Sequence, residues 1–154
     1  MEWNKNEIAE GLNDKCVENF GCSIKEVTDK QIYEAVCLLA REILMKKRRE
    51  FQIEYEKRNS KQLYYMSLEF LVGTSLRNNL YNLGLDKSFE QVLRGVGIKL
   101  QDLYDIEPDA GLGNGGLGRL ASCYMDAMTS CSMPATGFSI RYELGIFKQK
   151  IVDG

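Results

Sequence analysis

Helical periodicity dominates the first part of the chain. A weak pattern covers residues 4–20 and is followed by Gly21, a residue typical of the position just after a helix. A stronger pattern reaches about Arg58, since no Gly or Pro interrupts it, and its regularly spaced apolar residues predict one buried face: Ile32, Val36, Leu39 and Ile43. Two pairs ahead of it have the spacing of a capping box and predict helix starts: Ser23 with Glu26, and Thr28 with Gln31.

Shorter elements alternate after residue 60. Residues 63–72 are rich in aromatic and branched side chains and predict a buried strand. Three amphipathic segments predict short helices at residues 75–83, 88–96 and 100–104. Residues 117–130 are apolar nearly all round and predict a buried helix. Residues 138–144 and 146–152 predict two strands joined by a tight turn.

The most unusual stretch is residues 109–120, whose five glycines fall within eight positions and are followed by an apolar helix that we expect to begin near Gly116. We refer to residues 111–118 as the glycine loop. Glycines let a ligand approach the main chain, and a helix start presents unpaired N–H groups, so the stretch is consistent with an anion cradle made of backbone alone. A tight connection without a ligand is the alternative interpretation.

The glycine spacing also resembles two nucleotide-binding patterns. G-x-G-x-x-G occurs twice in overlap, but a dinucleotide fold needs a buried strand directly before it, and Pro108 disfavours one. A Walker-type phosphate loop needs Lys followed by Ser or Thr, and Arg119 followed by Leu120 stands there instead.

Two charged residues need partners. Glu69 lies between apolar residues, which favours a structural ion pair, and a place beside a ligand is the alternative. Arg119 lies in the first turn of a helix, where a cation opposes the helix dipole by about 0.3–1 kcal/mol. A pair with Asp109 or Glu107 would offset this, and contact with a bound anion is the alternative.

Composition places the chain among ordinary globular domains, with 154 residues, 44% hydrophobic and 27% charged. A net charge of −2 predicts no nucleic-acid or membrane partner, and the basic run at residues 46–49 is typical of a solvated face, with a subunit contact or effector site as the alternative. The sequence has no membrane-length apolar run and no signal peptide, which predicts a cytoplasmic protein.

Cysteine and histidine usage narrows the chemistry. The five cysteines are scattered and form no C-x-x-C pair, so we expect buried free thiols rather than a disulfide framework or a zinc site. The chain has no histidine, which excludes Ser-His-Asp and Cys-His catalysis within it. The groups that remain for any chemistry are carboxylates, lysines, backbone amides or a cofactor held elsewhere.

Four segments taken together resemble the α-glucan phosphorylases of glycogen, starch and maltodextrin: residues 64–73, 82–85, 107–121 and 140–147. The resemblance covers roughly residues 28–154 and is ordered along the chain. It implies an α/β fold, the start of the N-terminal Rossmann-like domain of a two-domain GT-B-type glycosyltransferase. Residues 1–60 would be a helical region, residues 61–154 would begin the catalytic domain, and several hundred further residues are expected.

The resemblance also implies a function. Family members hold pyridoxal 5′-phosphate on a lysine, here outside this chain, and use inorganic phosphate to release glucose 1-phosphate from the terminal α-1,4 bond of a glucan. Gly115 and Gly116 are the implied catalytic loop against the substrate phosphate and glucosyl unit. Asn114 and Leu117 are the implied substrate-binding residues, and Leu71, with Gly115 and Gly116, is an implied cofactor contact. No metal is implied. A homodimer is expected at full length, and this chain alone is expected to be inactive.

Three residues depart from the family pattern: Thr74 where arginine is usual, Ser139 where glycine is usual, and Lys148 where a shorter or acidic residue is common. They bear on local contacts only and leave the glycine loop untouched. Rival interpretations are a noncatalytic sugar- or phosphate-binding module and a dinucleotide-binding domain.

Overall fold

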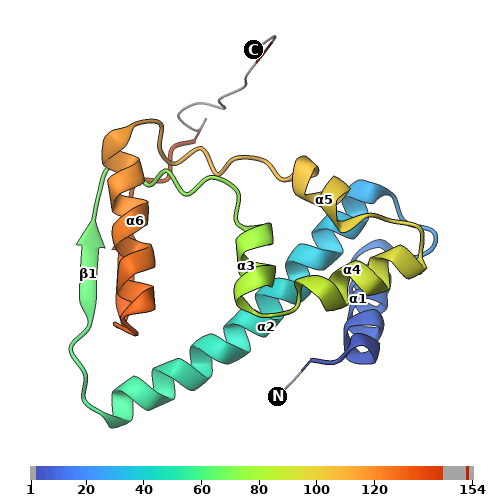
Figure 1. Cartoon of the computed structure of the whole chain (residues 1–154), viewed down its shortest axis with the longest axis horizontal. Coiled ribbons are helices and arrows are strands. Elements are labelled where there is room, and N and C mark those ends of the chain that lie inside the picture. The colour runs from blue at the N-terminus through green and yellow to red at the C-terminus, as the bar shows by residue number, and fades with distance from the viewer. Residues whose placement is uncertain (1–2, 144–151, 153–154) are drawn as a thin grey trace. The chain divides into compact units, whose positions relative to one another are not determined.

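The computed structural model describes residues 3–143 and residue 152. Its helices and strands are, in chain order, α1 (Lys5–Phe20), α2 (Asp29–Lys57), β1 (Leu63–Met66), α3 (Leu76–Asn82), α4 (Asp86–Gly95), α5 (Leu100–Ile106), α6 (Gly116–Ser130) and β2 (Ala135–Phe138) (Figure 1). They form two compact units, one of residues 1–49 with 75–108 and one of residues 50–74 with 109–154. Helices together with a small parallel sheet are compatible with the predicted α/β class.

Local capping sets the ends of the first two helices. The Asn4 side chain accepts the N–H of Glu7 at 3.1 Å while the Glu7 carboxylate accepts the N–H of Asn4 at 2.8 Å, a reciprocal capping box that starts α1. Gly21 ends α1 in the left-handed region at φ 70°, as predicted. The predicted box of Thr28 and Gln31 starts α2.

The predicted helix start at Ser23 is wrong. Only one of the two hydrogen bonds of a capping box forms, with the Ser23 N–H donating to the Glu26 carboxylate at 2.9 Å. The Ser23 hydroxyl also donates to that carboxylate, at 2.6 Å, and the Glu26 N–H donates to the Ser23 carbonyl at 3.0 Å. The backbone makes only a turn there before Thr28 begins α2. The box is therefore not reciprocal, and its spacing alone does not establish a helix.

The core of the first unit forms where α1, the N-terminal part of α2 and the short helices α3, α4 and α5 meet. The predicted apolar face of α2 is at most 2% exposed: Ile32, Val36, Leu39 and Ile43. Side chains from the other helices complete the same cluster, including Ile8, Leu12, Leu80, Phe89, Leu93 and Leu103. Cys16 rather than Val17 continues the buried face of α1, and Val17 is 51% exposed. Hydrophobic burial therefore holds this unit together.

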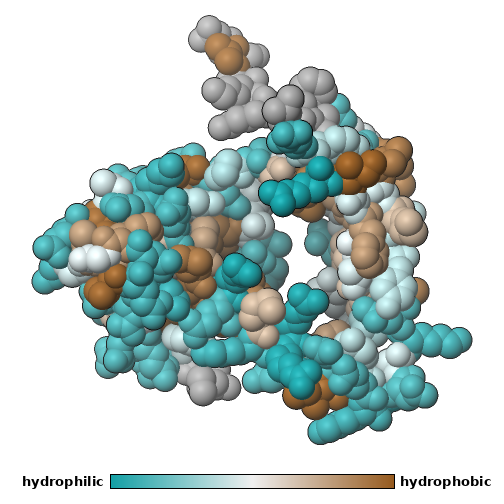
Figure 2. Space-filling model, turned by 180° about the vertical axis from the view of Figure 1, so that it is seen from behind, coloured by the Kyte–Doolittle hydropathy of each residue, from teal (hydrophilic) through white to brown (hydrophobic). Residues whose placement is uncertain are grey.

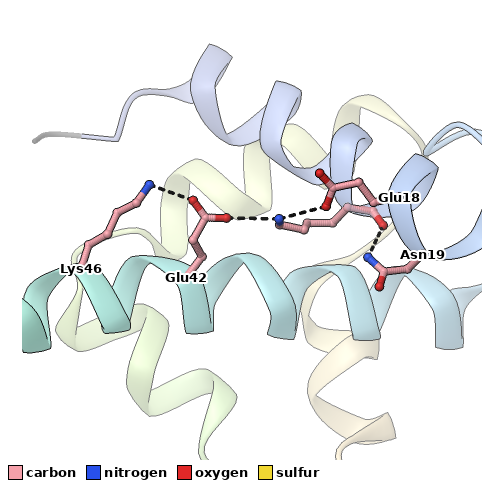
Figure 3. Close-up of polar contacts among 5 residues, drawn as sticks. Glu18, Asn19, Glu42 and Lys46 are labelled. Atoms are coloured by element: carbon pink, nitrogen blue, oxygen red, sulfur yellow. Dashed lines mark hydrogen bonds and ion pairs between the residues drawn. The ribbon is translucent and has the colours of Figure 1, made fainter.

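A chain of charged groups joins α1 to α2 on the surface of this unit (Figure 3). Lys15 Nζ lies 3.1 Å from the Glu18 carboxylate and 3.2 Å from that of Glu42, which also pairs with Lys46 at 2.8 Å. Hydrogen bonds from Lys46 first, and then from Lys15, lower the pKa of Glu42 below its ordinary value of 4.5. The hydrogen bonds to Glu18 and Glu42 raise the pKa of Lys15 above 10.5.

Stability should depend on pH through this network. Since the pKa of Glu42 is lowered in the folded chain, its contribution is present above about pH 4.5 and is lost as the pH falls through the folded value. We expect Glu42→Gln to lower the free energy of unfolding by about 0.2–1 kcal/mol at neutral pH. The difference should vanish in acid. Urea denaturation, followed by the fluorescence of Trp3 at neutral and at acidic pH, measures the unfolding free energies of the parent and the variant. A difference that persisted well below pH 4.5 would contradict the role of the Glu42 carboxylate in this network.

The second unit is built on a parallel pair of strands. Leu63 is opposite Ala135 and Met66 is opposite Phe138 in the register of β1 and β2. Helix α6 lies along β1 (Figure 1), and the rings of Tyr65 and Tyr124 are 5.9 Å apart. Phe70, just past β1, is buried against the edge of the Tyr65 ring. The carboxyl end of β1 therefore leads directly into the segment that meets the glycine loop.

Three expectations for this unit are wrong. The strand predicted at residues 63–72 ends at Met66: after one further bond from the Ser67 N–H to the Phe138 carbonyl, the backbone of Phe70 and Leu71 bonds to the glycine loop instead. Strand β1 is also largely exposed rather than buried. Helix α6 is not buried, since Leu117, Leu120 and Tyr124 are each about half exposed. Figure 2 shows one face of the molecule, on which further hydrophobic residues lie at the surface. The strand predicted at 138–144 lies instead at Ala135–Phe138, and most of the one predicted at 146–152 lies outside the described residues.

Two smaller observations complete the fold. Cys16 is buried as predicted, but Cys123 and Cys131 are exposed, so the expectation of buried thiols is wrong for these two. Among the helices of the described residues, none combines the length and the apolar character needed to cross a membrane.

Candidate functional site

Three consecutive residues beyond β1 hold the glycine loop in place. The N–H of Phe70 donates to the carbonyl of Leu112 at 2.7 Å, and the N–H of Leu71 donates to that of Gly118 at 3.0 Å. Between these two bonds, the Glu69 carboxylate accepts the N–H of Asn114 at 2.9 Å. The loop is therefore fixed near its start, near its middle and at its end by one short segment.

Two glycines of the loop are required by its packing. A Cβ on Gly113 would lie 2.5 Å from the backbone nitrogen of Leu71, a distance that real Cβ atoms do not show. A Cβ on Gly118 would lie 3.0 Å from the side chain of Glu69 and from the same nitrogen. Both glycines let the loop lie directly against the segment that holds it.

Gly111 is required by its backbone conformation instead. It has φ 66°, which side chains with a Cβ rarely adopt, and its N–H donates to the Asp109 carboxylate at 2.8 Å. The first bend of the loop is thus set by glycine and stabilised by a local acceptor.

Gly115 and Gly116 have no such internal reason to be glycine. Among the described residues, a Cβ on Gly116 would meet no heavy atom within 4 Å, and one on Gly115 would meet only the Glu69 carboxylate, at 4.0 Å. Neither has φ in the left-handed region. Gly116 is exposed and is the first residue of α6, and Gly115 precedes it with no side chain to cap the helix. These two residues therefore leave an open backbone at the positive end of the helix dipole.

The partners predicted for the two charged residues are wrong. Arg119 donates through Nη1 to the carbonyl of Leu71 at 3.4 Å. Asp109 accepts from Gly111 instead, and the Glu107 carboxylate accepts the N–H groups of Ser75 at 2.7 Å and Leu76 at 3.0 Å. In the described part of the chain, Glu69 forms no ion pair and is used as a hydrogen-bond acceptor.

Comparison with known proteins identifies the family of this chain. A family model described as carbohydrate phosphorylase matches residues 93–154, a stretch that includes the whole glycine loop. Glycogen phosphorylase 2 of Dictyostelium discoideum is 46% identical over 129 residues, which is 84% of this chain and 13% of that protein. The chain belongs to the carbohydrate phosphorylase family.

Further phosphorylase relatives extend the match to nearly all of the chain. The brain form of glycogen phosphorylase from Bos taurus is 45% identical over 82% of this chain and 15% of its own length. Glycogen phosphorylase of Saccharomyces cerevisiae is 38% identical over 99% of this chain and 19% of its own length. The chain therefore spans less than a fifth of the length of these phosphorylases.

The residues predicted for the site from the phosphorylase resemblance form one continuous surface feature. Asn114, Gly115, Gly116 and Leu117 run from the middle of the loop into the first turn of α6, and Asn114, Gly116 and Leu117 are exposed. Leu71 lies beside them, since its backbone bonds to Gly118 and accepts from Arg119. No group of three or more potential metal ligands occurs within the described residues.

Sequence reasoning missed how the segment beyond β1 supports the loop. Neither the backbone bonds of Phe70 and Leu71 nor the bond between Glu69 and Asn114, 45 residues apart, follows from periodicity. The usable signal was Glu69 itself, a carboxylate between apolar residues that had to have a partner.

Proposed function

We propose that this chain supplies the glycine-loop wall of the active site of an α-glucan phosphorylase. The reaction is phosphorolysis of the terminal α-1,4-glucosidic bond of glycogen or maltodextrin, which yields glucose 1-phosphate. One observation carries the proposal: Gly115 and Gly116 are the loop glycines that neither packing nor backbone angles require, and they lie at the start of a helix. A ligand that must come within contact distance of the main chain explains them.

The proposed roles follow from the chemistry of these groups. The first N–H groups of α6 have no acceptor within the helix and favour an anion, so Gly115 and Gly116 would face the substrate phosphate and the glucosyl unit. Leu117 would add an apolar contact to the sugar, and Asn114 would support the loop from the side that Glu69 holds. Arg119 adds a positive charge in the same first turn, where it would favour a dianionic substrate.

The same surface suits the phosphate group of a cofactor. In this proposal, a lysine outside the chain would hold pyridoxal 5′-phosphate, which would supply a phosphate group close to the inorganic phosphate. The residues fit such a group, because no atom of the described residues lies within 4 Å of a Cβ on Gly116, only the Glu69 carboxylate approaches one on Gly115, and the backbone of half-buried Leu71 lies next to the loop. This chain's own part is to position the phosphates and to keep side chains out of the space that they need.

The finer architecture belongs to the same proposal. The two-stranded parallel sheet with α6 beside it would be the beginning of the N-terminal Rossmann-like domain of a GT-B-type enzyme. Ligands of parallel sheets bind beyond the carboxyl ends of the strands, and the segment of residues 69–71 follows that end of β1. The division into residues 1–60 and 61–154, a homodimer and a cytoplasmic location stay predictions.

The function is tested with the complete protein that carries this chain. Incubated with maltodextrin and inorganic phosphate, it should release glucose 1-phosphate and show the absorbance of bound pyridoxal phosphate. The 154-residue chain alone should do neither, because the family resemblance implies a cofactor lysine outside it. Binding of glucan by the complete protein without any glucose 1-phosphate release would favour the noncatalytic module. Glucose 1-phosphate release by the chain alone would contradict the assignment of the cofactor site.

A further inference from the structure

We propose that Glu69 is a positioning residue of the glycine loop, an inference that rests on the proposed phosphorolytic function. Its Oε2 accepts the N–H of Asn114 at 2.9 Å. The positions that Cβ atoms would take on Gly118 and Gly115 lie 3.0 and 4.0 Å from the same carboxylate group. The carboxylate thus lies on the inner side of the loop, facing the residues that lead into α6.

The open tip of the loop needs such an anchor. In the part of the chain that the structure describes, no atom lies within 4 Å of a Cβ at Gly116, and only the Glu69 carboxylate reaches that distance from one at Gly115. Their placement therefore depends on Asn114 before them and on the first turn of α6 after them. The bond from Asn114 to Glu69 fixes the direction of the peptide group that leads into the two glycines.

Hydrogen bonding, rather than negative charge, explains the choice of this residue. A carboxylate close to a phosphate site opposes the binding of an anion, so its charge does not aid the substrate. Its side chain is long enough to reach the loop, and its oxygen accepts the N–H of Asn114 there. The side chain is only partly buried, and its main chain is fixed independently, since the Ser67 hydroxyl donates to the Glu69 carbonyl at 2.8 Å.

Three substitutions at Glu69 in the complete protein separate positioning from chemistry. Glu69→Ala removes the acceptor and Glu69→Asp shortens it, and each should lower kcat/KM for phosphate about 10²-fold, the typical effect of a displaced reactive group. Glu69→Gln keeps both the length and an acceptor oxygen, so it should stay within about threefold of the parent. If Gln were as damaging as Ala, the carboxylate would act by its charge or as an acid or base, and the proposal would be wrong.

Glu107 offers a matched control. It is a second carboxylate that accepts backbone N–H groups from a distant segment, those of Ser75 and Leu76 at the start of α3. Glu107→Ala should loosen that helix start but leave kcat/KM for phosphate within about threefold of the parent, because the backbone groups that Glu107 holds belong to α3 and not to the loop. An equal loss of activity in Glu69→Ala and Glu107→Ala would reduce Glu69 to a general stabilising role and overturn the inference.

A readout without turnover keeps the inference separate from the proposed function. Hydrogen exchange of peptides covering residues 112–118 should be faster in Glu69→Ala than in the parent and in Glu69→Gln. If the complete protein released no glucose 1-phosphate but showed this exchange pattern, the positioning role of Glu69 would be supported and the proposed phosphorolytic function would be wrong. Unchanged exchange in Glu69→Ala would overturn the positioning role, whatever the activity of the protein.

Discussion

Replacing Gly116 by alanine in the complete protein is expected to lower turnover by about 10²–10³, the typical effect of losing one well-placed donor to a developing anion. The added methyl group would point into the space that the phosphate or the glucosyl unit occupies. The fold itself should tolerate it, because that methyl group would meet no heavy atom of the described residues within 4 Å, and φ at Gly116 is outside the left-handed region.

Gly95 provides the control for this substitution. It is the last residue of α4, and a Cβ there also meets no described atom within 4 Å, but it lies outside the glycine loop. Gly95→Ala should therefore leave kcat and the KM for phosphate unchanged, with a change in unfolding free energy of about 1 kcal/mol at most. Steady-state kinetics and thermal unfolding of both variants make the comparison. Parental turnover and an unchanged KM for phosphate in Gly116→Ala would show that Gly115 and Gly116 form a structural turn.

Local signals in the sequence predicted the helices well. The capping box of Thr28 and Gln31, the apolar face from Ile32 to Ile43 and the glycine after α1 each depend on residues within a few positions of one another. The start of α6 at Gly116 was predicted for the same reason. Such elements are specified by contacts between residues that are close in the sequence, so the sequence pattern alone predicts them.

Features that depend on distant partners were not predictable in this way. Residues 63–72 have strand composition, but the backbone of Phe70 and Leu71 bonds to the glycine loop more than 40 residues later, so the strand ends at Met66. The apolar pattern of α6 predicted a buried helix, but burial depends on which other elements cover it. Within the described residues, Leu117 and Leu120 are exposed. For the candidate site, the glycines pointed to an anion, whereas the division of the loop into packed and open glycines required coordinates.

That division predicts a different outcome at Gly113, where alanine should damage folding and activity together. Its Cβ would lie 2.5 Å from the nitrogen of Leu71 and 2.7 Å from the carbonyl carbon of Phe70, and both are backbone atoms that cannot rotate away. Either the loop or the segment of residues 69–71 must shift. We expect the free energy of unfolding to fall by about 1–3 kcal/mol, the typical effect of overpacking, and the bond from Phe70 to Leu112 to weaken as well.

Gly113→Ala and Gly116→Ala together test whether the loop has one packed side and one open side. Thermal unfolding and glucose 1-phosphate release should both decline in the first variant, whereas only release should decline in the second. Hydrogen exchange over residues 69–71 should rise in Gly113→Ala alone, since only that methyl group collides with their backbone. If Gly113→Ala unfolded at the parental temperature with parental exchange, the close approach of Gly113 to Leu71 would not be a packing constraint. The open backbone at Gly116 would then no longer distinguish a ligand-facing glycine from a structural one.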